Sequence, residues 1–122
     1  MLNSTDGLPG VYLAESISKA ILCSGTEKPC GVCNSCRLTE NRSHPDLLYT
    51  FPFISAGKTG SSENYISEWK EFLSEFPVFL YEDWNIFLDS GNKQLGIYTG
   101  ETHRITRFQS MKPYLSKKKV II

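Results

Sequence analysis

The feature that most constrains this chain is the placement of its four cysteines, which all lie between positions 23 and 36. They are Cys23, Cys30, Cys33 and Cys36, in the pattern C-x6-C-x2-C-x2-C. Two disulfides so close together would form a tight knot. The N-terminus also lacks the basic start and apolar stretch of a signal peptide, so we expect a reducing, cytoplasmic setting. Four thiolates can instead close a tetrahedron around Zn²⁺.

Zinc is the metal that this spacing favours, and two alternatives remain. A ferredoxin-type iron–sulfur run would place its fourth cysteine at position 40, which is Glu40, so that pattern fails. Redox-active thiols without a metal are the other alternative. Four protein ligands leave no open coordination position, so the zinc would be structural rather than catalytic. His44 could compete as a ligand, but we interpret His44-Pro45-Asp46 as a turn leading into a strand.

Composition places the chain among small globular domains. With 122 residues, 40% hydrophobic and 12% aromatic, it can bury a core, which excludes full-length disorder. The net charge of zero excludes a uniformly basic nucleic-acid binder, and no apolar run reaches the roughly 20 residues of a membrane helix. Residues 63–89 nevertheless carry seven acids and one lysine, and residues 92–122 carry seven basic residues and one acid. We interpret these as two solvated faces, with a basic partner for the acidic part as the alternative.

Hydrophobic periodicity predicts alternating helices and strands. A helix over residues 10–22, with Val11, Ala14 and Ile21 on its apolar face, leads directly to Cys23. Further helices are predicted at 37–40, 65–76, 80–90 and 105–112, and strands at 46–51, 95–97 and 120–122, with Gly100 ending the second strand. Strands that alternate with helices favour an α/β fold with a parallel sheet. Because the last strand has only begun when the sequence stops, we expect a piece of a longer domain.

Two segments resemble parts of a phosphate-binding P-loop, and neither has its chemistry. Residues 57–59, Gly-Lys-Thr, would need a glycine at position 52, which is Pro52, so we interpret them as a solvated loop. Gly7, Pro9 and Gly10 precede the first helix in the manner of such a loop, but the lysine is missing and Pro9 removes a backbone N–H. We therefore predict a degenerate P-loop with no nucleotide-binding residues.

No catalytic residues are predicted either. No serine lies in a G-x-S-x-G motif, and neither His44 nor His103 has a motif around it. The carboxylates of residues 63–89 have the pattern of solvated helix faces rather than of an acid/base pair.

These residues together resemble a known family, the clamp-loader subunits of bacterial DNA polymerase III. The segments that carry the resemblance to its zinc module are Leu13-Ala14, Ala20–Cys23, Pro29–Arg37 and His44–Leu47. The segments that resemble the insert of delta-prime subunits from Bacteroidetes-type bacteria are Phe51–Phe53, Trp69–Leu73, Asp83-Trp84 and Asn92–Tyr98. The likeness also puts Gly10 where an active subunit has its P-loop lysine, and Tyr12 where it has the Mg²⁺-binding hydroxyl.

The resemblance implies an incomplete AAA+, P-loop NTPase-like fold. Residues 1–122 would form part of the AAA+ domain, with a zinc module at 23–36 and a helical insert at about 55–91. Compared with that family, we expect residues 1–122 to lack the first sheet strand and the Walker B, sensor, Ser-Arg-Cys, lid and collar regions. The four cysteines would hold a structural Zn²⁺.

The resemblance also implies a function. The chain would belong to a non-catalytic, delta-prime-like subunit that contacts gamma/tau and delta subunits and helps place the beta clamp on primed DNA, without a membrane. One alternative is a gamma/tau-type ATPase subunit. Another is a free-standing zinc module that binds nucleic acid, for which the basic residues 112–119 could contact phosphates.

Overall fold

The computed structural model describes residues 10–55 and 60–122. Its α-helices are α1 (Gly10–Leu22), α2 (Asn34–Glu40), α3 (Ile66–Glu75), α4 (Tyr81–Phe87) and α5 (Thr99–Ser110), and the 3₁₀-helix η1 (Ser62–Tyr65) precedes α3. The strands are β1 (Leu47–Leu48), β2 (Phe53–Ile54), β3 (Leu95–Gly96) and β4 (Val120–Ile121). The architecture is therefore a mixed fold of helices around short strands.

Two separate strand pairs take the place of the single parallel sheet expected from the sequence. β1 and β4 pair in parallel, with Leu47 opposite Val120, whereas β2 and β3 pair antiparallel, with Phe53 opposite Gly96. The parallel arrangement is confirmed for β1 and β4 alone, and a full AAA+ parallel sheet is not seen in the described residues. Pro52 accounts for the break between β1 and β2, because it has no N–H to donate to a strand ladder.

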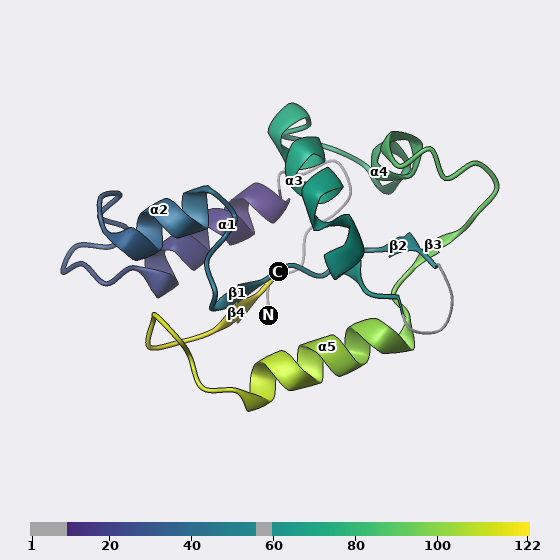
Figure 1. Cartoon of the computed structure of the whole chain (residues 1–122). Coiled ribbons are helices and arrows are strands. Elements are labelled where there is room, and N and C mark those ends of the chain that lie inside the picture. Colours follow the sequence, from purple (N-terminus) through teal and green to yellow (C-terminus); the bar gives the residue numbers. More distant parts are fainter. Residues whose placement is uncertain (1–9, 56–59) are drawn as a thin grey trace.

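Helices surround these strands. Figure 1 shows the β1–β4 pair near the middle of the molecule, with α1 and α2 to its left and α5 below. α1 and α2 pack against each other, and α3 and α4 lie toward the β2–β3 side. Among the helices of the described residues, none has the length and apolar character needed to span a bilayer.

The hydrophobic core is largely aromatic. Phe51 stacks on Trp69 with ring centroids 4.4 Å apart, and Trp84 meets Trp69 edge-on at 4.9 Å. Trp84 also donates its indole N–H to the Pro52 carbonyl at 2.7 Å. The buried residues of this core are Leu22, Leu47, Tyr49, Phe51, Trp69, Phe72, Leu73, Trp84 and Leu95. Because burial of one such side chain contributes about 1.5–3 kcal/mol, α3 and α4 are held firmly to the strands.

The helix boundaries agree with the sequence predictions at some ends and differ at others. α1 spans residues 10–22 as expected, and α3 ends before Pro77. α2 begins earlier than expected because Cys33 caps it, its sulfur accepting the Cys36 N–H. The expectation that Gly100 ends a strand is wrong, because Gly100 lies in the first turn of α5.

Burial departs from the hydrophobic pattern in the first helix and the first strand. On α1 the buried side chains are Ser18 and Leu22, whereas Ile21, expected on the buried face, is 39% exposed. Ser18 can be buried because its hydroxyl donates to the Ala14 carbonyl at 2.6 Å. The strand expected at residues 46–51 is limited to β1, although Tyr49 beyond it is buried as the apolar run implied.

One buried carboxylate ties the C-terminal segment to the turn before β1. Asp46 is fully buried, and its carboxylate accepts the backbone N–H groups of Tyr114 at 2.6 Å, Leu115 at 2.8 Å and Ser116 at 2.7 Å. Burial alone would raise the pKa of Asp46, but these three hydrogen bonds outweigh it and hold the pKa below its ordinary value. The Asp46 carbonyl also accepts the Val120 N–H at 2.9 Å, which sets the register of β4.

A second buried carboxylate fixes α5. Glu101 is fully buried and accepts both the N–H and the hydroxyl of Ser62, each at 2.8 Å. Arg104 donates to the same carboxylate at 2.8 Å and to the Tyr49 carbonyl at 2.9 Å. The beginning of α5 is therefore joined to η1 and to the chain after β1.

We predict that Asp46→Ala lowers the free energy of unfolding by roughly 3 kcal/mol near neutral pH, because it removes the buried acceptor of three backbone N–H groups. A carboxylate whose pKa is lowered by folding stabilises the protein above its unfolded pKa, and this contribution is lost as the pH falls through the folded pKa. The difference between the two proteins should therefore shrink under acid. Urea unfolding near pH 7 and near pH 3 measures both effects. Glu82→Ala, at an exposed carboxylate on α4, is the control, and an equal loss in this control would contradict the assignment.

Candidate metal centre

The four cysteines come from two helices and the loop that joins them. Cys23 follows α1 directly, with its N–H bonded to the Lys19 carbonyl at 3.1 Å, and Cys36 lies in the first turn of α2. Cys30 and Cys33 lie in the connecting loop and are half-buried, whereas Cys23 and Cys36 are buried. The packing of α1 against α2 therefore brings the first and last cysteine together.

The four sulfurs lie close enough together to share one metal ion. All four Sγ atoms lie within 4.8 Å of one another, and no cysteine is in a disulfide. The Cys23 sulfur lies 3.6 Å from that of Cys30 and 3.9 Å from that of Cys33. Zinc–sulfur bonds of about 2.3 Å at tetrahedral angles place the sulfurs about 3.8 Å apart. The two separations from the Cys23 sulfur are close to this value and far exceed the roughly 2.05 Å of a disulfide bond.

Backbone N–H groups point at the sulfurs. Gly25 and Cys30 donate to the Cys23 sulfur at 3.3 Å and 3.4 Å, Cys33 donates to Cys30 at 3.4 Å, and Cys36 donates to Cys33 at 3.4 Å. Such donors favour thiolates, which are the form that binds metal.

The sulfurs differ in acidity. Hydrogen bonding by the Ser24 side chain and by the Cys36 N–H lowers the pKa of Cys33 to about 5. Burial raises the pKa of Cys36 to about 12. A divalent cation among the four sulfurs would supply the positive charge that lets the buried Cys36 ionise.

Glycine lets the loop pass close to the sulfurs. A Cβ atom at Gly25 would lie 2.9 Å from the Cys30 Cβ and 3.0 Å from its sulfur, so a side chain there would push this cysteine away. Gly31 has a φ of +75°, a conformation that favours glycine, at the turn between Cys30 and Cys33. The sequence therefore allows both the close approach and the turn that the cluster requires.

His44 lies outside the sulfur cluster. Its Nδ1 accepts the Asp46 N–H at 3.0 Å, and its Nε2 lies 3.2 Å from the Ser116 hydroxyl. In the described part of the chain, the group of potential metal ligands consists of the four cysteines alone. The interpretation of His44 as part of the turn before the strand is confirmed, since the turn leads into β1. An all-sulfur donor set suits Zn²⁺ and leaves no position for a reactive water.

Ser116 connects the cysteine cluster to the rest of the fold, a role that no motif in the sequence predicts. Its hydroxyl donates to the carbonyl of Leu22, the residue before the first cysteine, at 2.8 Å. The Ser35 hydroxyl, next to the last cysteine, lies 3.4 Å from the hydroxyl oxygen of Ser116. Because Asp46 holds the Ser116 backbone, the cluster and the β1–β4 pair are linked through this one residue.

The degenerate P-loop can be placed only in part. Gly7 and Pro9 lie outside the described residues, as does the loop at 57–59, and Gly10 is the first residue of α1. Tyr12 donates its hydroxyl to the Leu73 carbonyl on α3, so this hydroxyl is already used within the fold.

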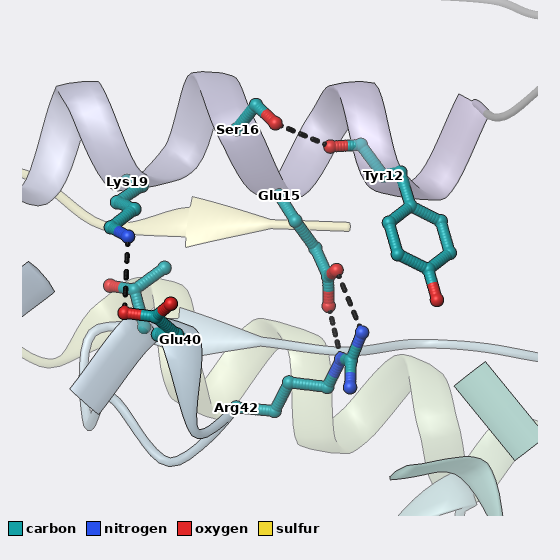
Figure 2. A pocket seen from close by; sticks show the side chains of 7 residues that line it. Tyr12, Glu15, Ser16, Lys19, Glu40 and Arg42 are labelled. Atoms are coloured by element: carbon teal, nitrogen blue, oxygen red, sulfur yellow. Dashed lines mark hydrogen bonds and ion pairs between the residues drawn. The ribbon is translucent and has the colours of Figure 1, made fainter. Parts of the chain in front are cut away.

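A pocket of about 260 Å³ lies between α1 and the end of α2 (Figure 2). Arg42 binds the Glu15 carboxylate through two nitrogens, at 2.5 Å and 3.1 Å, and Lys19 pairs with Glu40 at 3.2 Å. The Tyr49 hydroxyl adds a hydrogen bond to Glu15 at 2.7 Å. The two cations that line this pocket are therefore each paired with a carboxylate.

We predict that the chain binds one zinc ion and that Cys33→Ser abolishes this binding and unfolds residues 23–36 locally. Removal of one sulfur opens the tetrahedron and leaves the loop with too little apolar burial to hold its shape. Native mass spectrometry gives the stoichiometry, and hydrogen exchange reports the local unfolding. The control is Val32→Ser at the neighbouring position, which is 71% exposed and should keep its metal. Unchanged zinc content in Cys33→Ser would refute the ligand assignment.

We predict a second, graded effect at Gly25. In Gly25→Ala the new methyl group presses on Cys30, so the dissociation constant for zinc should rise about tenfold while the stoichiometry stays at one. Competition with a chromophoric chelator measures this constant. Thr26→Ala changes the adjacent, exposed residue and should leave the constant unchanged. Equal affinities in the two variants would show that the loop does not approach the metal as described.

Comparison with known proteins identifies the family of the chain. The family model described as DNA polymerase III, delta subunit, matches residues 1–122. No curated protein and no solved structure matches the chain. The chain belongs to the DNA polymerase III delta-subunit family, and it is a clamp-loader family domain that carries four clustered cysteines.

Proposed function

We propose that this chain is a delta-prime-like, non-catalytic part of the clamp loader, which helps place the beta clamp on primed DNA during replication. The observation that carries the proposal is the family match over residues 1–122, together with the absence of any lysine or arginine before Lys19. Membership in the family supports a role in the DNA polymerase III holoenzyme, which acts in the cytoplasm. The missing cation supports a subunit that does not use ATP.

The case against nucleotide binding rests on the chemistry of the P-loop. That loop needs a lysine for the β- and γ-phosphates and a small hydroxyl for Mg²⁺, at the beginning of the helix that follows it. Here the helix begins at Gly10, and Tyr12 stands at the position expected for the hydroxyl. The Tyr12 hydroxyl contacts the Leu73 carbonyl instead. The nearby cations, Lys19 and Arg42, are paired with carboxylates.

A structural Zn²⁺ at Cys23, Cys30, Cys33 and Cys36 fits a rigid, non-catalytic subunit. It would fix the loop between α1 and α2 as a firm projection from the strands, with no open position for chemistry. A rigid subunit can serve as a fixed support for gamma/tau and delta subunits while the ATPase subunits move. Contact with the beta clamp and with primed DNA would then occur through the whole assembly.

The test has a nucleotide arm and an assembly arm. We predict no saturable binding of a fluorescent ATP analogue with Mg²⁺, under conditions in which a gamma/tau subunit binds it. We also predict that the protein, carrying an affinity tag on its chromosomal gene, co-purifies with gamma/tau and delta subunits from its own cells.

Each alternative gives a different result. Saturable ATP binding would favour a gamma/tau-type ATPase. Failure to recover clamp-loader subunits, with salt-dependent DNA binding by the purified chain, would favour a free-standing nucleic-acid module. The co-purification is repeated with tagged Cys33→Ser and Val32→Ser proteins. Loss of the partners in Cys33→Ser alone would indicate that assembly requires the metal, whereas loss in both would indicate an effect of the tag.

A further inference from the structure

A groove runs along the zinc module on the outward side of α1. It is formed by two adjoining hollows of about 420 Å³ and 270 Å³, which share Ile21, Lys28 and Lys117. Its walls are α1, the loop after Cys23 and the segment at residues 115–118. We call this the lysine groove, with a floor of Ile17, Ile21 and Leu115 and a rim of Lys28, Lys117 and Lys118.

The floor of the lysine groove is apolar and open to solvent. Ile21 is 39% exposed and Leu115 is 40% exposed, and neither belongs to the buried core. α1 buries Ser18 and Leu22, and Ile21 lies about 100° around the helix from Leu22, at the edge of this face, where it stays partly exposed. Exposed aliphatic side chains in a concave surface gain free energy when a partner covers them.

The rim carries three lysines that form no ion pair among the described residues. Across residues 10–55 and 60–122, the ion pairs join Lys19 to Glu40, Arg42 to Glu15, and Arg104 to two glutamates. No rim lysine takes part in them, and no aspartate or glutamate lines either hollow. Carboxylates on a partner protein could form ion pairs with these lysines.

We propose that the lysine groove binds a segment of a partner protein that presents aliphatic side chains flanked by carboxylates. The aliphatic side chains would cover the floor, and the carboxylates would meet the three lysines. A protein segment fits better than a nucleic acid, because the groove offers no aromatic ring on which a base could stack, and phosphates would leave the apolar floor uncovered.

The metal centre shapes one wall of this groove. Lys28 and Gly25 lie in the loop between Cys23 and Cys30, whose path is held by hydrogen bonds to the Cys23 sulfur. Ser116 fixes the opposite wall by its bond to the Leu22 carbonyl. Docking should therefore depend on zinc, although the metal touches no partner. The proposal goes beyond the clamp-loader role and holds for either type of subunit.

Fluorescence anisotropy with labelled probes on the zinc-loaded full chain tests the proposal. The probes are an amphipathic peptide of leucine and glutamate at helical spacing, the same peptide with leucine replaced by serine, and single-stranded oligothymidylate. We expect saturable binding of the first peptide alone. The double variant Lys117→Glu/Lys118→Glu should weaken it at least about tenfold, and Ile21→Ser should weaken it measurably. Removal of zinc by a chelator should abolish it.

The matched control is Lys93→Glu/Lys112→Glu, which makes the same change in charge at exposed lysines outside the groove and should bind as the unaltered chain does. Zinc content and far-ultraviolet circular dichroism confirm that each variant is folded. Equal binding of the serine peptide, tighter binding of oligothymidylate, or an equal loss in the control would overturn the proposal. Co-purification with gamma/tau and delta is a separate result, so the failure of one proposal is distinguishable from the failure of the other.

Discussion

The arrangement of the described chain depends on one carboxylate more than on any other group. Asp46 lies in the turn before β1 and accepts three consecutive backbone N–H groups from residues 114–116. A buried charge is stable only when it is fully hydrogen-bonded, so this contact fixes the C-terminal segment at a single position. That position sets the register of β4 through the Val120 N–H, and it presents Ser116 to the end of α1. Asp46 therefore positions both the β1–β4 pair and the segment that contacts the cysteine cluster.

The two halves of the molecule are stabilised in different ways. Around α3 and α4, stacked and edge-on aromatic rings such as Phe51, Trp69 and Trp84 supply the burial. The loop between α1 and α2 has little to bury, since Val32 is 71% exposed and residues 26–29 are all exposed. Apolar burial cannot order such a loop against its conformational entropy. Four thiolates around a metal ion would order this loop. The cysteines can therefore have a structural role that involves no catalysis.

Sequence analysis predicted the features that depend on neighbouring residues, and it missed those that depend on contacts between residues far apart in the chain. The spacing of the cysteines predicted their cluster, and the periodicity of residues 10–22 predicted α1 to the residue. Asp46, Glu101 and Ser116 were missed as anchors, because their partners lie 68–70, 39 and 94 residues away in the chain. Gly100 was misplaced for the same reason: glycine favours a strand end locally, but the bonds of Glu101 to Ser62 begin α5 there. The antiparallel pairing of β2 with β3 likewise joins Phe53 to Gly96 and Ile54 to Leu95, which lie far apart in the chain.

The distribution of charge separates what serves folding from what remains for partners. The buried or half-buried charges are satisfied inside the fold, as Glu101 with Arg104 and Glu15 with Arg42 show. The lysines of the lysine groove are exposed and take part in none of the ion pairs found among the described residues. Exposed charges contribute little to stability, so folding does not explain why three of them surround an apolar floor. The loop after Cys23 forms one wall of the lysine groove. On our two proposals, a zinc ion held by the four cysteines would therefore serve to keep a docking surface in shape.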